Sequence, residues 1–485
     1  MQTWLTSAEG GMQPSTARLA VHPHPDVRIV VHPDRPRQTL RGIGGALTQA
    51  SAFALESLSA TRRDEVLQAL FHPERSAYSL VRTHVASCDF STHSYTYAPR
   101  EDPQLADFSI DVDRTNGHLA LLHDAAAVPG AAFDLIASPW TAPPWMKDTR
   151  LYFDPAQQRG GRLLEAHHDT FARYLVRYVQ EMHAEGLTIW ALTPLNEPHG
   201  NRGSWESMEM PPEQQAALLQ ILDERLQQAG LDTRVLIYDQ NRPGALDYAI
   251  PVLGSATVAP RVLGTAVHWY DSTFRVFESQ LEELHARFPD HEIMQTEGCI
   301  DNVFGLDDDR GPSAALPWWT DESWYWRKEA TDWGWDHEEN PERDHPRYAP
   351  AFRYARDLVG GLAHWLTGWV DWNVVLDKRG GPNHVGNFCV APILIDGERD
   401  EVYYTPLFHL MEQVSRHTRP GAVVFETEPR PAEGLWVVAL RNPGGDRVVH
   451  MFNEGSVARR CHVSFDGPEV ELVCPPASLR TLVLP

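Results

Sequence analysis

The sequence has few cysteines, no long apolar run and no excess of basic residues, and each shortage excludes a class of protein. Its five cysteines, in 485 residues, are widely spaced and form no CxxC pair or Cys/His cluster at metal-ligand spacing. We therefore expect buried free thiols in a reducing compartment rather than disulfides or a metal site. No run of about 18 apolar residues is present, so no membrane-spanning helix is expected.

Basic charge is also scarce. Lys and Arg number 42 against 66 Asp and Glu, which gives a formal net charge of −24. Such a surface repels nucleic acid and anionic lipid, so we expect neither as a partner and favour a neutral small substrate. Solubility alone would explain the charge equally well. The first ten residues lack a basic segment followed by an apolar one, so no secretory signal is predicted and a cytoplasmic location is expected.

The middle of the chain alternates segments of helical and strand periodicity. Residues 168–186 carry apolar side chains at helical spacing up to Gly186, a residue typical of a helix C-cap, and residues 187–193 then form a short apolar run. The same unit recurs along the chain. The candidate strands are residues 41–46, 79–85, 133–137, 187–193, 234–238, 262–268, 292–296 and 365–370. The pattern predicts an α/β fold, a (β/α)₈ TIM barrel.

The last part of the chain has a different pattern of apolar and turn-forming residues. Short strand-like runs at 423–425, 435–440, 448–452 and 472–474 are separated by Pro, Gly and Asn, which is typical of an all-β domain. Residues 20–21 and 27–31 look similar. We therefore predict a catalytic barrel over 41–404, a β-sandwich domain over 405–485, and N-terminal strands within 1–40 that join the β-domain.

Two glutamates stand where predicted barrel strands end. Glu197 follows the apolar run 187–193, and Glu297 ends the run 292–296. Barrel enzymes place reacting groups at this end of the strands, and a pair of carboxyls is what glycoside cleavage needs. Each glutamate could instead be half of a structural ion pair, Glu197 with Arg202 and Glu297 with Arg82. Function and structure remain about equally plausible on position alone.

Tryptophan is abundant, with 16 residues. Indole rings offer flat apolar platforms for the C–H face of a sugar, although a single Trp more often packs in a core. Four of them, Trp140, Trp145, Trp269 and Trp372, fall at strand ends or in loops. Six more lie in the charged segment 303–347, which we interpret as a loop over the active-site mouth that lines a leaving-group site or a homo-oligomer contact.

Ordered blocks between about residues 40 and 408 resemble glycoside hydrolase family 30, in particular its glucosylceramidase branch. The blocks span residues 44–48, 82–91, 137–143, 193–198, 266–270, 296–299, 368–373 and 380–388. The resemblance implies a (β/α)₈ barrel with an attached β-sandwich and a retaining mechanism, without a cofactor or a metal. It implies Glu197 as acid/base and Glu297 as nucleophile.

The same resemblance implies roles for the residues around the two glutamates. Asn196 is similar to a residue that hydrogen-bonds the sugar 2-hydroxyl, and Arg82 and Tyr270 resemble residues that hold the nucleophile. The substrate-binding set implied by the blocks is Asp89, Trp140, Asn196, His268, Tyr270, Trp372 and Asn387. Asp89 and Trp140 together favour a sugar with hydroxyls at C4 and C6, so glucose is favoured over xylose.

The leading hypothesis is an exo-acting retaining β-glucosidase. The alternatives are a β-xylosidase, β-fucosidase or β-1,6-glucanase on the same scaffold, and a catalytically silent carbohydrate-binding protein.

Overall fold

The computed structural model describes residues 1–22, 24–301, 321–327, 349–428 and 434–485. Most of the Trp-rich segment 303–347 therefore lies outside the described residues. Eight parallel strands close into a barrel, which confirms the predicted fold class. In barrel order they are β5 (Gly42–Ala46), β6 (Leu80–Val85), β7 (Asp134–Pro139), β8 (Ile189–Leu192), β9 (Arg234–Asn241), β10 (Val262–His268), β11 (Glu292–Glu297) and β13 (Leu366–Asp371).

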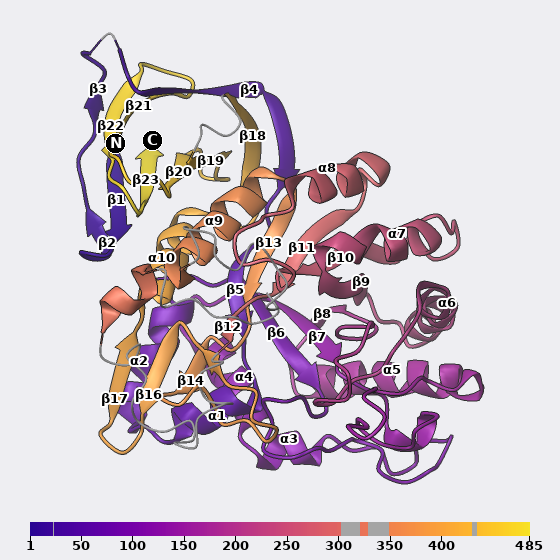
Figure 1. Ribbon diagram of the computed structural model, residues 1–485. Helices are drawn as coiled ribbons and strands as arrows, with labels where there is room; N and C mark the ends of the chain where they lie inside the picture. Colours follow the sequence, from indigo (N-terminus) through magenta and orange to yellow (C-terminus); the bar gives the residue numbers. More distant parts are fainter. Residues whose placement is uncertain (23, 302–320, 328–348, 429–433) are drawn as a thin grey trace.

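Helices surround the barrel (Figure 1). They are α1 (Gln49–Glu56), α2 (Ala60–Phe71), α3 (Asp111–Thr115), α4 (His118–Ala127), α5 (His168–Ala184), α6 (Pro212–Gln228), α7 (Ala245–Leu253), α8 (Glu278–Arg287), α9 (Pro350–Ala363) and α10 (Pro406–His417). Helix α8 begins at Glu278, because Phe277 just before it has a left-handed backbone with φ of +58°. Two short sheets follow β11 and β13 in the chain. One pairs β12 (Ile300–Asp301) with β15 (Cys389–Val390), and the other joins β14 (Val375–Asp377), β16 (Ile393–Asp396) and β17 (Glu401–Tyr404).

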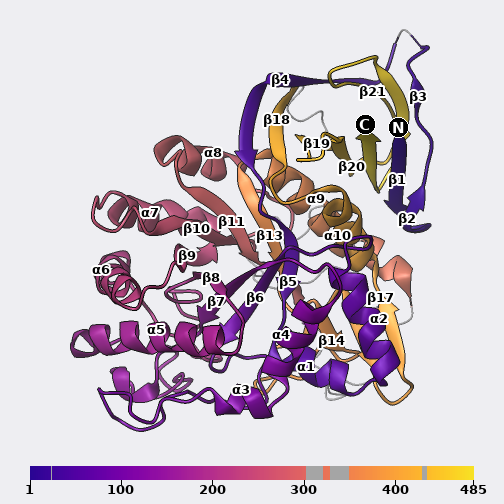
Figure 2. The same cartoon turned by 180° about the vertical axis from the view of Figure 1, so that it is seen from behind.

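The second lobe is an all-β domain built from both ends of the chain (Figures 1 and 2). Its N-terminal strands are β1 (Gln2–Ser7), β2 (Gly10–Pro14), β3 (Arg18–Leu19) and β4 (Val27–Thr39). Its C-terminal strands are β18 (Val423–Glu428), β19 (Leu435–Arg441), β20 (Arg447–Asn453), β21 (Arg459–Ser464), β22 (Val470–Cys474) and β23 (Ser478–Leu484). The strand order is β2-β1-β23-β20-β19-β18-β4-β21-β22-β3, so β4 joins the two groups of C-terminal strands.

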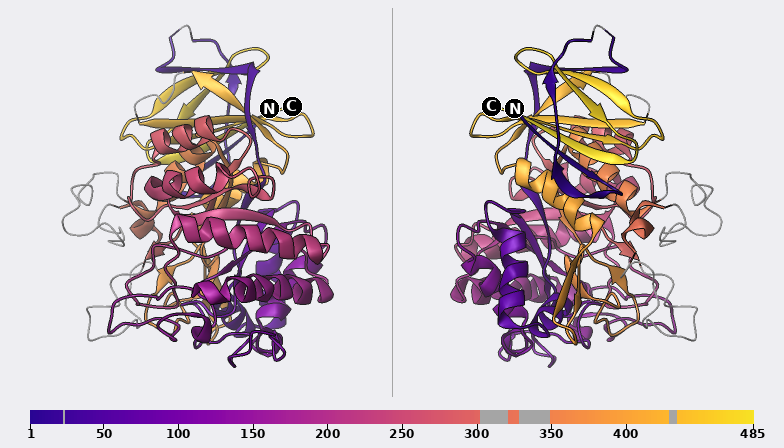
Figure 3. Two further views of the ribbon diagram at one scale, coloured as in Figure 1. Left: turned by 90° about the vertical axis from the view of Figure 1, so that its right-hand side faces the viewer. Right: turned by 90° about the vertical axis from the view of Figure 1, so that its left-hand side faces the viewer.

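The thirteen-residue strand β4 connects the two lobes. Its first residues pair in parallel with β21, its later residues pair antiparallel with β18, and the chain then enters the first barrel strand, β5, at Gly42. Helices α9 and α10 lie between the barrel and the β-domain, and both contact β-domain strands (Figure 3). The interface between the lobes is therefore made of helices that also cover the barrel.

A buried ion pair crosses this interface. Arg356 on α9 donates from Nε to the Glu454 carboxylate at 2.7 Å, and both side chains are at most 4% exposed. Since removing one partner leaves a buried charge, we expect Glu454→Gln to lower the free energy of unfolding by about 3–5 kcal/mol. Removal of the exposed pair Arg62–Glu65 should leave the free energy of unfolding nearly unchanged and serves as the control. Denaturant midpoints measure both, and equal shifts would contradict the prediction.

Two of the tryptophans in the charged segment fall within the described residues. Trp324, in the 3₁₀ turn Glu322–Trp326, is buried, and Trp326 packs edge-on against Phe352 of α9 at 6.3 Å. The expectation that these rings line a leaving-group site or a subunit contact is therefore wrong for Trp324, which belongs to the core. In the described part of the chain, no helix is both long and apolar enough to cross a membrane.

Candidate active site

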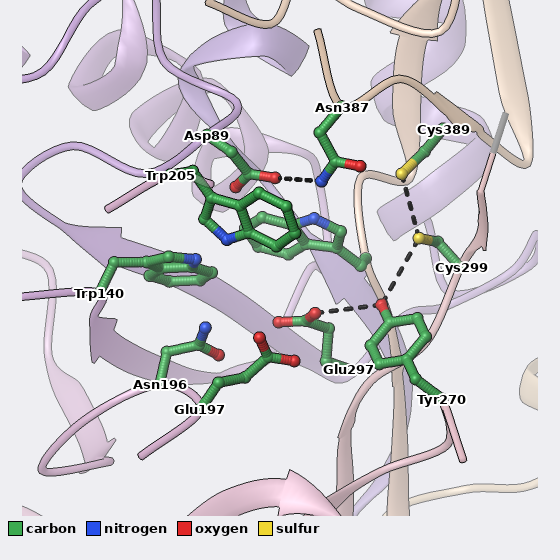
Figure 4. A pocket seen from close by; sticks show the side chains of 11 residues that line it. Asp89, Trp140, Asn196, Glu197, Trp205, Tyr270, Glu297, Cys299, Asn387 and Cys389 are labelled. Carbon is green, nitrogen blue, oxygen red and sulfur yellow. Dashed lines mark hydrogen bonds between the residues drawn. The ribbon is translucent and has the colours of Figure 1, made fainter. Parts of the chain in front are cut away.

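The barrel strands bring the two glutamates together at one pocket (Figure 4). Glu297 is the last residue of β11. Glu197 lies five residues beyond the end of β8, where a left-handed backbone (φ +48°) is held by a hydrogen bond from its N–H to the Asp239 carbonyl at 3.0 Å. The nearest side-chain oxygens of Glu197 and Glu297 lie within 4.8 Å of each other. Arg202 is exposed, and the side chain that contacts the Glu197 carboxyl is His268 instead, with Nδ1 3.2 Å from Oε1.

Arg82 organises the floor of the pocket. This fully buried guanidinium donates to Glu297 Oε2 at 2.5 Å, to Asn196 Oδ1 at 2.7 Å, to Asp239 Oδ2 at 2.8 Å and to Ser138 Oγ at 3.1 Å. Guanidinium N–H groups only donate, so the Asn196 atom that faces Arg82 must be the amide oxygen. The Asn196 NH₂ group is therefore left to donate toward the pocket.

Glu297 accepts a second hydrogen bond. Tyr270 Oη donates to Glu297 Oε1 at 3.0 Å, opposite the bond from Arg82. Burial raises the pKa of Glu297, while the positive charges of His268 and Arg82 oppose this shift. Since both direct partners donate to the carboxylate, the hydrogen bonds favour the ionised form that a nucleophile needs.

Asp239, near the end of β9, was not among the predicted site residues, yet its carboxylate contacts side chains from four other strands, β6, β7, β10 and β11. Burial alone would raise its pKa, but the charge of Arg82 and a hydrogen bond from His268 lower it. Its carboxylate also accepts from Thr193 at 2.8 Å and from Thr296 at 2.6 Å. Asp239 is thus a fixed negative charge beneath the two glutamates.

His268 lies behind the glutamates rather than at the pocket surface. Its side chain is wholly buried, with Nε2 3.0 Å from Asp239 Oδ1 and Nδ1 3.2 Å from Glu197 Oε1. Although burial lowers its pKa, the surrounding carboxylates, Glu297 first, raise it to about 9. A side chain between carboxylates is well placed to hold Glu197. It is less well placed for the sugar contact that the sequence predicted for His268. Glu197, His268 and Glu297 also have metal-ligand spacing, and a metal there would have to displace the proton of His268.

The raised pKa of His268 predicts a pH-dependent stability. A histidine with a pKa near 6.5 when unfolded and about 9 when folded stabilises the fold fully below about pH 6.5, and the stabilisation disappears as pH rises through 9. We expect the free energy of unfolding to fall over this window in the wild type and to fall less in His268→Asn. Denaturant titrations from pH 6 to 10 measure the difference. Parallel pH curves for the two proteins would contradict the assignment.

The opposite side of the pocket carries groups suited to a sugar (Figure 4). Trp140 and Trp372 stack with ring centroids 5.0 Å apart. Asn387 donates to Asp89 Oδ2 at 2.8 Å, while the buried Asp89 Oδ1 has no hydrogen-bond partner within the described residues. An acceptor held in this way is available to a sugar hydroxyl. Of the other two strand-end tryptophans, Trp145 donates to the Ala98 carbonyl and Trp269 to the Cys299 carbonyl, and both are buried.

Three pocket residues were not predicted from sequence: Trp205, Cys299 and Cys389. Trp205 lies in the loop between β8 and α6, where nothing in the local sequence separates it from a packed indole. The loop is tied down on both sides, because Glu206 accepts from Ser87 at 3.0 Å and Lys147 donates to the Ser207 carbonyl at 2.9 Å. Trp205 therefore projects from a fixed backbone into the pocket that Glu197 and Glu297 share.

Comparison with known proteins agrees with this architecture. Residues 40–310 and 329–418 match the glycosyl hydrolase family 30 TIM-barrel domain. The chain is 29% identical to lysosomal acid glucosylceramidase of Mus musculus over 433 residues, which is 88% of this chain and 77% of the relative. It is 27% identical to an endo-1,6-beta-D-glucanase of Neurospora crassa over 437 residues, 87% of this chain and 80% of that protein.

A solved structure shares the whole arrangement. The crystal structure of SrfJ from Salmonella typhimurium superposes with a TM-score of 0.83 at 26% identity, covering 100% of this chain and 99% of that one. The barrel, the β-domain and their relative placement are thus common to both proteins. Together with the match over both parts of the barrel, this places the chain in glycosyl hydrolase family 30, as a glycoside hydrolase that acts on carbohydrate.

Proposed function

We propose that this enzyme is an exo-acting retaining β-glycosidase that hydrolyses β-glucosides, with Glu297 as nucleophile and Glu197 as acid/base. The observation that carries the proposal is the approach of the two carboxyl groups to within 4.8 Å across one pocket. Retaining enzymes hold these groups about 5–5.5 Å apart, whereas inverting enzymes leave about 6.5–9.5 Å for a water molecule.

Charge balance supports the division of labour between the glutamates. Arg82 and His268 supply two positive charges, and ionised Asp239 and Glu297 supply two negative charges. A proton on Glu197 leaves this buried group neutral overall. Glu197 can then protonate the leaving oxygen while Glu297 attacks the anomeric carbon. In the second step Glu197 accepts a proton from water, which releases the sugar with its configuration retained.

The pocket groups support a glucose-like sugar and attack from its non-reducing end. The Asn196 NH₂ is placed to donate to a 2-hydroxyl, a contact that strengthens as the oxocarbenium ion develops. Asp89 and Asn387 lie across the pocket from Glu197 and are joined to each other (Figure 4), so they close the end at which a longer chain would continue.

An aryl-glycoside panel tests the sugar. Because a xyloside lacks the C6 hydroxymethyl group, we expect aryl β-glucoside to be the better substrate. We expect Asp89→Ala to reduce kcat/KM for glucoside by about 5–100-fold, the value of roughly 1–3 kcal/mol for leaving a buried hydrogen-bonding group without its partner. The loss for xyloside should be smaller. Preference for aryl xyloside or fucoside in the wild type would overturn the choice of glucose.

A second candidate is a β-1,6-glucanase, favoured by the 27% identity to the Neurospora crassa enzyme. A β-1,6-glucan polymer separates the two. Release of glucose alone supports the exo-acting glucosidase, and release of a ladder of short oligosaccharides with little aryl-glucoside turnover supports the glucanase.

A further inference from the structure

Two thiols touch each other on the wall of the active-site pocket. Cys299 Sγ and Cys389 Sγ lie 3.2 Å apart, and both residues line the pocket together with Glu297 and Tyr270 (Figure 4). The arrangement follows from the small antiparallel pair β12–β15, in which Ile300 pairs with Val390 and Asp301 with Cys389. Cys299, the residue just before β12, is therefore a diagonal neighbour of Cys389 on β15 and within its reach.

This thiol pair is connected to the nucleophile. Cys299 follows Glu297 by two residues, and its Sγ lies 3.5 Å from Tyr270 Oη, the group that donates to Glu297 at 3.0 Å. On the other side, Cys389 follows Asn387 by two residues, and Asn387 holds Asp89 at 2.8 Å. A bond between the sulfurs would thus join the end of the nucleophile strand to the segment that grips the sugar.

We propose that Cys299 and Cys389 form a reversible disulfide under oxidation by a peroxide, and that the disulfide lowers the activity of the enzyme. One thiolate attacks hydrogen peroxide, which gives a sulfenic acid and releases hydroxide, neutralised to water by the thiol proton. The second thiol then attacks the sulfenic sulfur, the S–S bond forms, and a second water leaves. Two thiols and one peroxide give one disulfide and two waters.

The closure needs only a small movement. A disulfide bond is about 2.05 Å long, so the sulfurs must approach by roughly 1.2 Å. That shift draws Cys299 away from Tyr270 and disturbs the hydrogen bond that orients Glu297. Because misplacement of a reacting group by about 1 Å can cost about 10²-fold in rate, we expect oxidised enzyme to lose at least about tenfold in kcat.

The chain offers a matched control pair. Cys461 and Cys474 of the β-domain pair β21–β22 are also diagonal neighbours, since Cys461 pairs with Leu472 and Arg459 with Cys474, and their sulfurs are 3.8 Å apart. Both are fully buried in the β-domain core, and neither is among the residues that line the active-site pocket. The two pairs differ mainly in access to the active-site pocket.

The experiment treats the fully reduced protein with hydrogen peroxide, then maps cross-links by non-reducing peptide mass spectrometry and measures aryl-glucoside turnover before and after dithiothreitol. We expect a Cys299–Cys389 cross-link that appears as activity falls and disappears as dithiothreitol restores it. Cys299→Ser and Cys389→Ser, each compared with its own untreated form, should show no dithiothreitol-reversible loss. Cys461→Ala should respond as the wild type does.

Three results would overturn the proposal: no Cys299–Cys389 cross-link, a cross-link without loss of turnover, or a loss that dithiothreitol does not reverse. The activity arm rests on the proposed function, whereas the cross-link does not. A protein that turns over no β-glycoside when reduced would refute the proposed function. In that case two measurements test the thiol pair: detection of the cross-link, and calorimetric binding of a glucose-shaped iminosugar to the reduced and the oxidised protein. We expect the cross-link to abolish this binding, and unchanged binding would refute the proposed regulation.

Discussion

Glu297→Gln is expected to abolish turnover on every β-glycoside, with a loss of kcat of about 10⁵-fold or more, the scale seen when a covalent nucleophile is removed. The amide keeps the size of the side chain but cannot form the glycosyl–enzyme bond. No leaving group, however reactive, should restore the rate. Steady-state kinetics with aryl glucosides measures the loss, and mass spectrometry with a 2-fluoro glucoside should find a covalent adduct on Glu297 in the wild type and none in the variant.

The control for this variant lies on the same strand. Glu292 begins β11 at the opposite end of the barrel, where it pairs with Arg41 at 2.6 Å. Glu292→Gln makes the same chemical change far from the pocket and should leave kcat near the wild-type value. An adduct that maps to another carboxylate, or substantial turnover by Glu297→Gln, would remove Glu297 from the mechanism.

Glu197→Ala is expected to lower kcat by roughly 10²–10⁴-fold for poor leaving groups, as is typical of general acid–base catalysis. A leaving group that departs without protonation should recover much of the first step. Azide can enter the space left by the side chain and attack the glycosyl–enzyme, so it should partly restore the rate and give a β-glycosyl azide. The measurement is a plot of log kcat/KM against leaving-group pKa for wild type and variant.

Glu213 in the first turn of α6 offers a matched control, since Glu213→Ala removes the same group from a helix on the outer face of the barrel. It should show neither leaving-group dependence nor azide rescue. If the loss in Glu197→Ala is the same for all leaving groups, another residue supplies the proton.

The barrel could be predicted from sequence because its signals are local. Each strand is a short apolar run next to a helix of clear periodicity, and all eight predicted strands occur in the structure. The strands of the β-domain were harder to predict from the sequence. Strand β21, with Arg459, Arg460 and His462, lacks an apolar run, and it is stabilised by its pairing with β4 some 430 positions earlier in the chain. Non-local pairing leaves little trace in a single sequence.

In the candidate site, too, some residues could be predicted from local sequence and others could not. Glu197, Glu297 and Arg82 were predicted, and the structure brings them together. Asp239 could have been found by the rule that polar residues at the ends of barrel strands matter, since it directly follows the predicted strand 234–238. Trp205 could not, because its position depends on how Glu206 and Lys147 fasten a loop. The prediction for Trp324 was wrong for the opposite reason, since its charged neighbours in the sequence suggested an exposed ring and the ring is buried.

Strand β4 has a consequence for synthesis of the protein. Apart from the pairing of β1 with β2, the strands within residues 2–39 pair with β18, β21, β22 and β23, so the whole barrel is inserted between two halves of one sheet. At about 5–20 residues per second, a ribosome needs roughly 20–80 s to make the intervening segment. Throughout that interval the early strands carry unsatisfied backbone hydrogen-bonding groups, which invite pairing with other nascent chains. The sheet of the β-domain can therefore be completed only after the whole barrel has been synthesised.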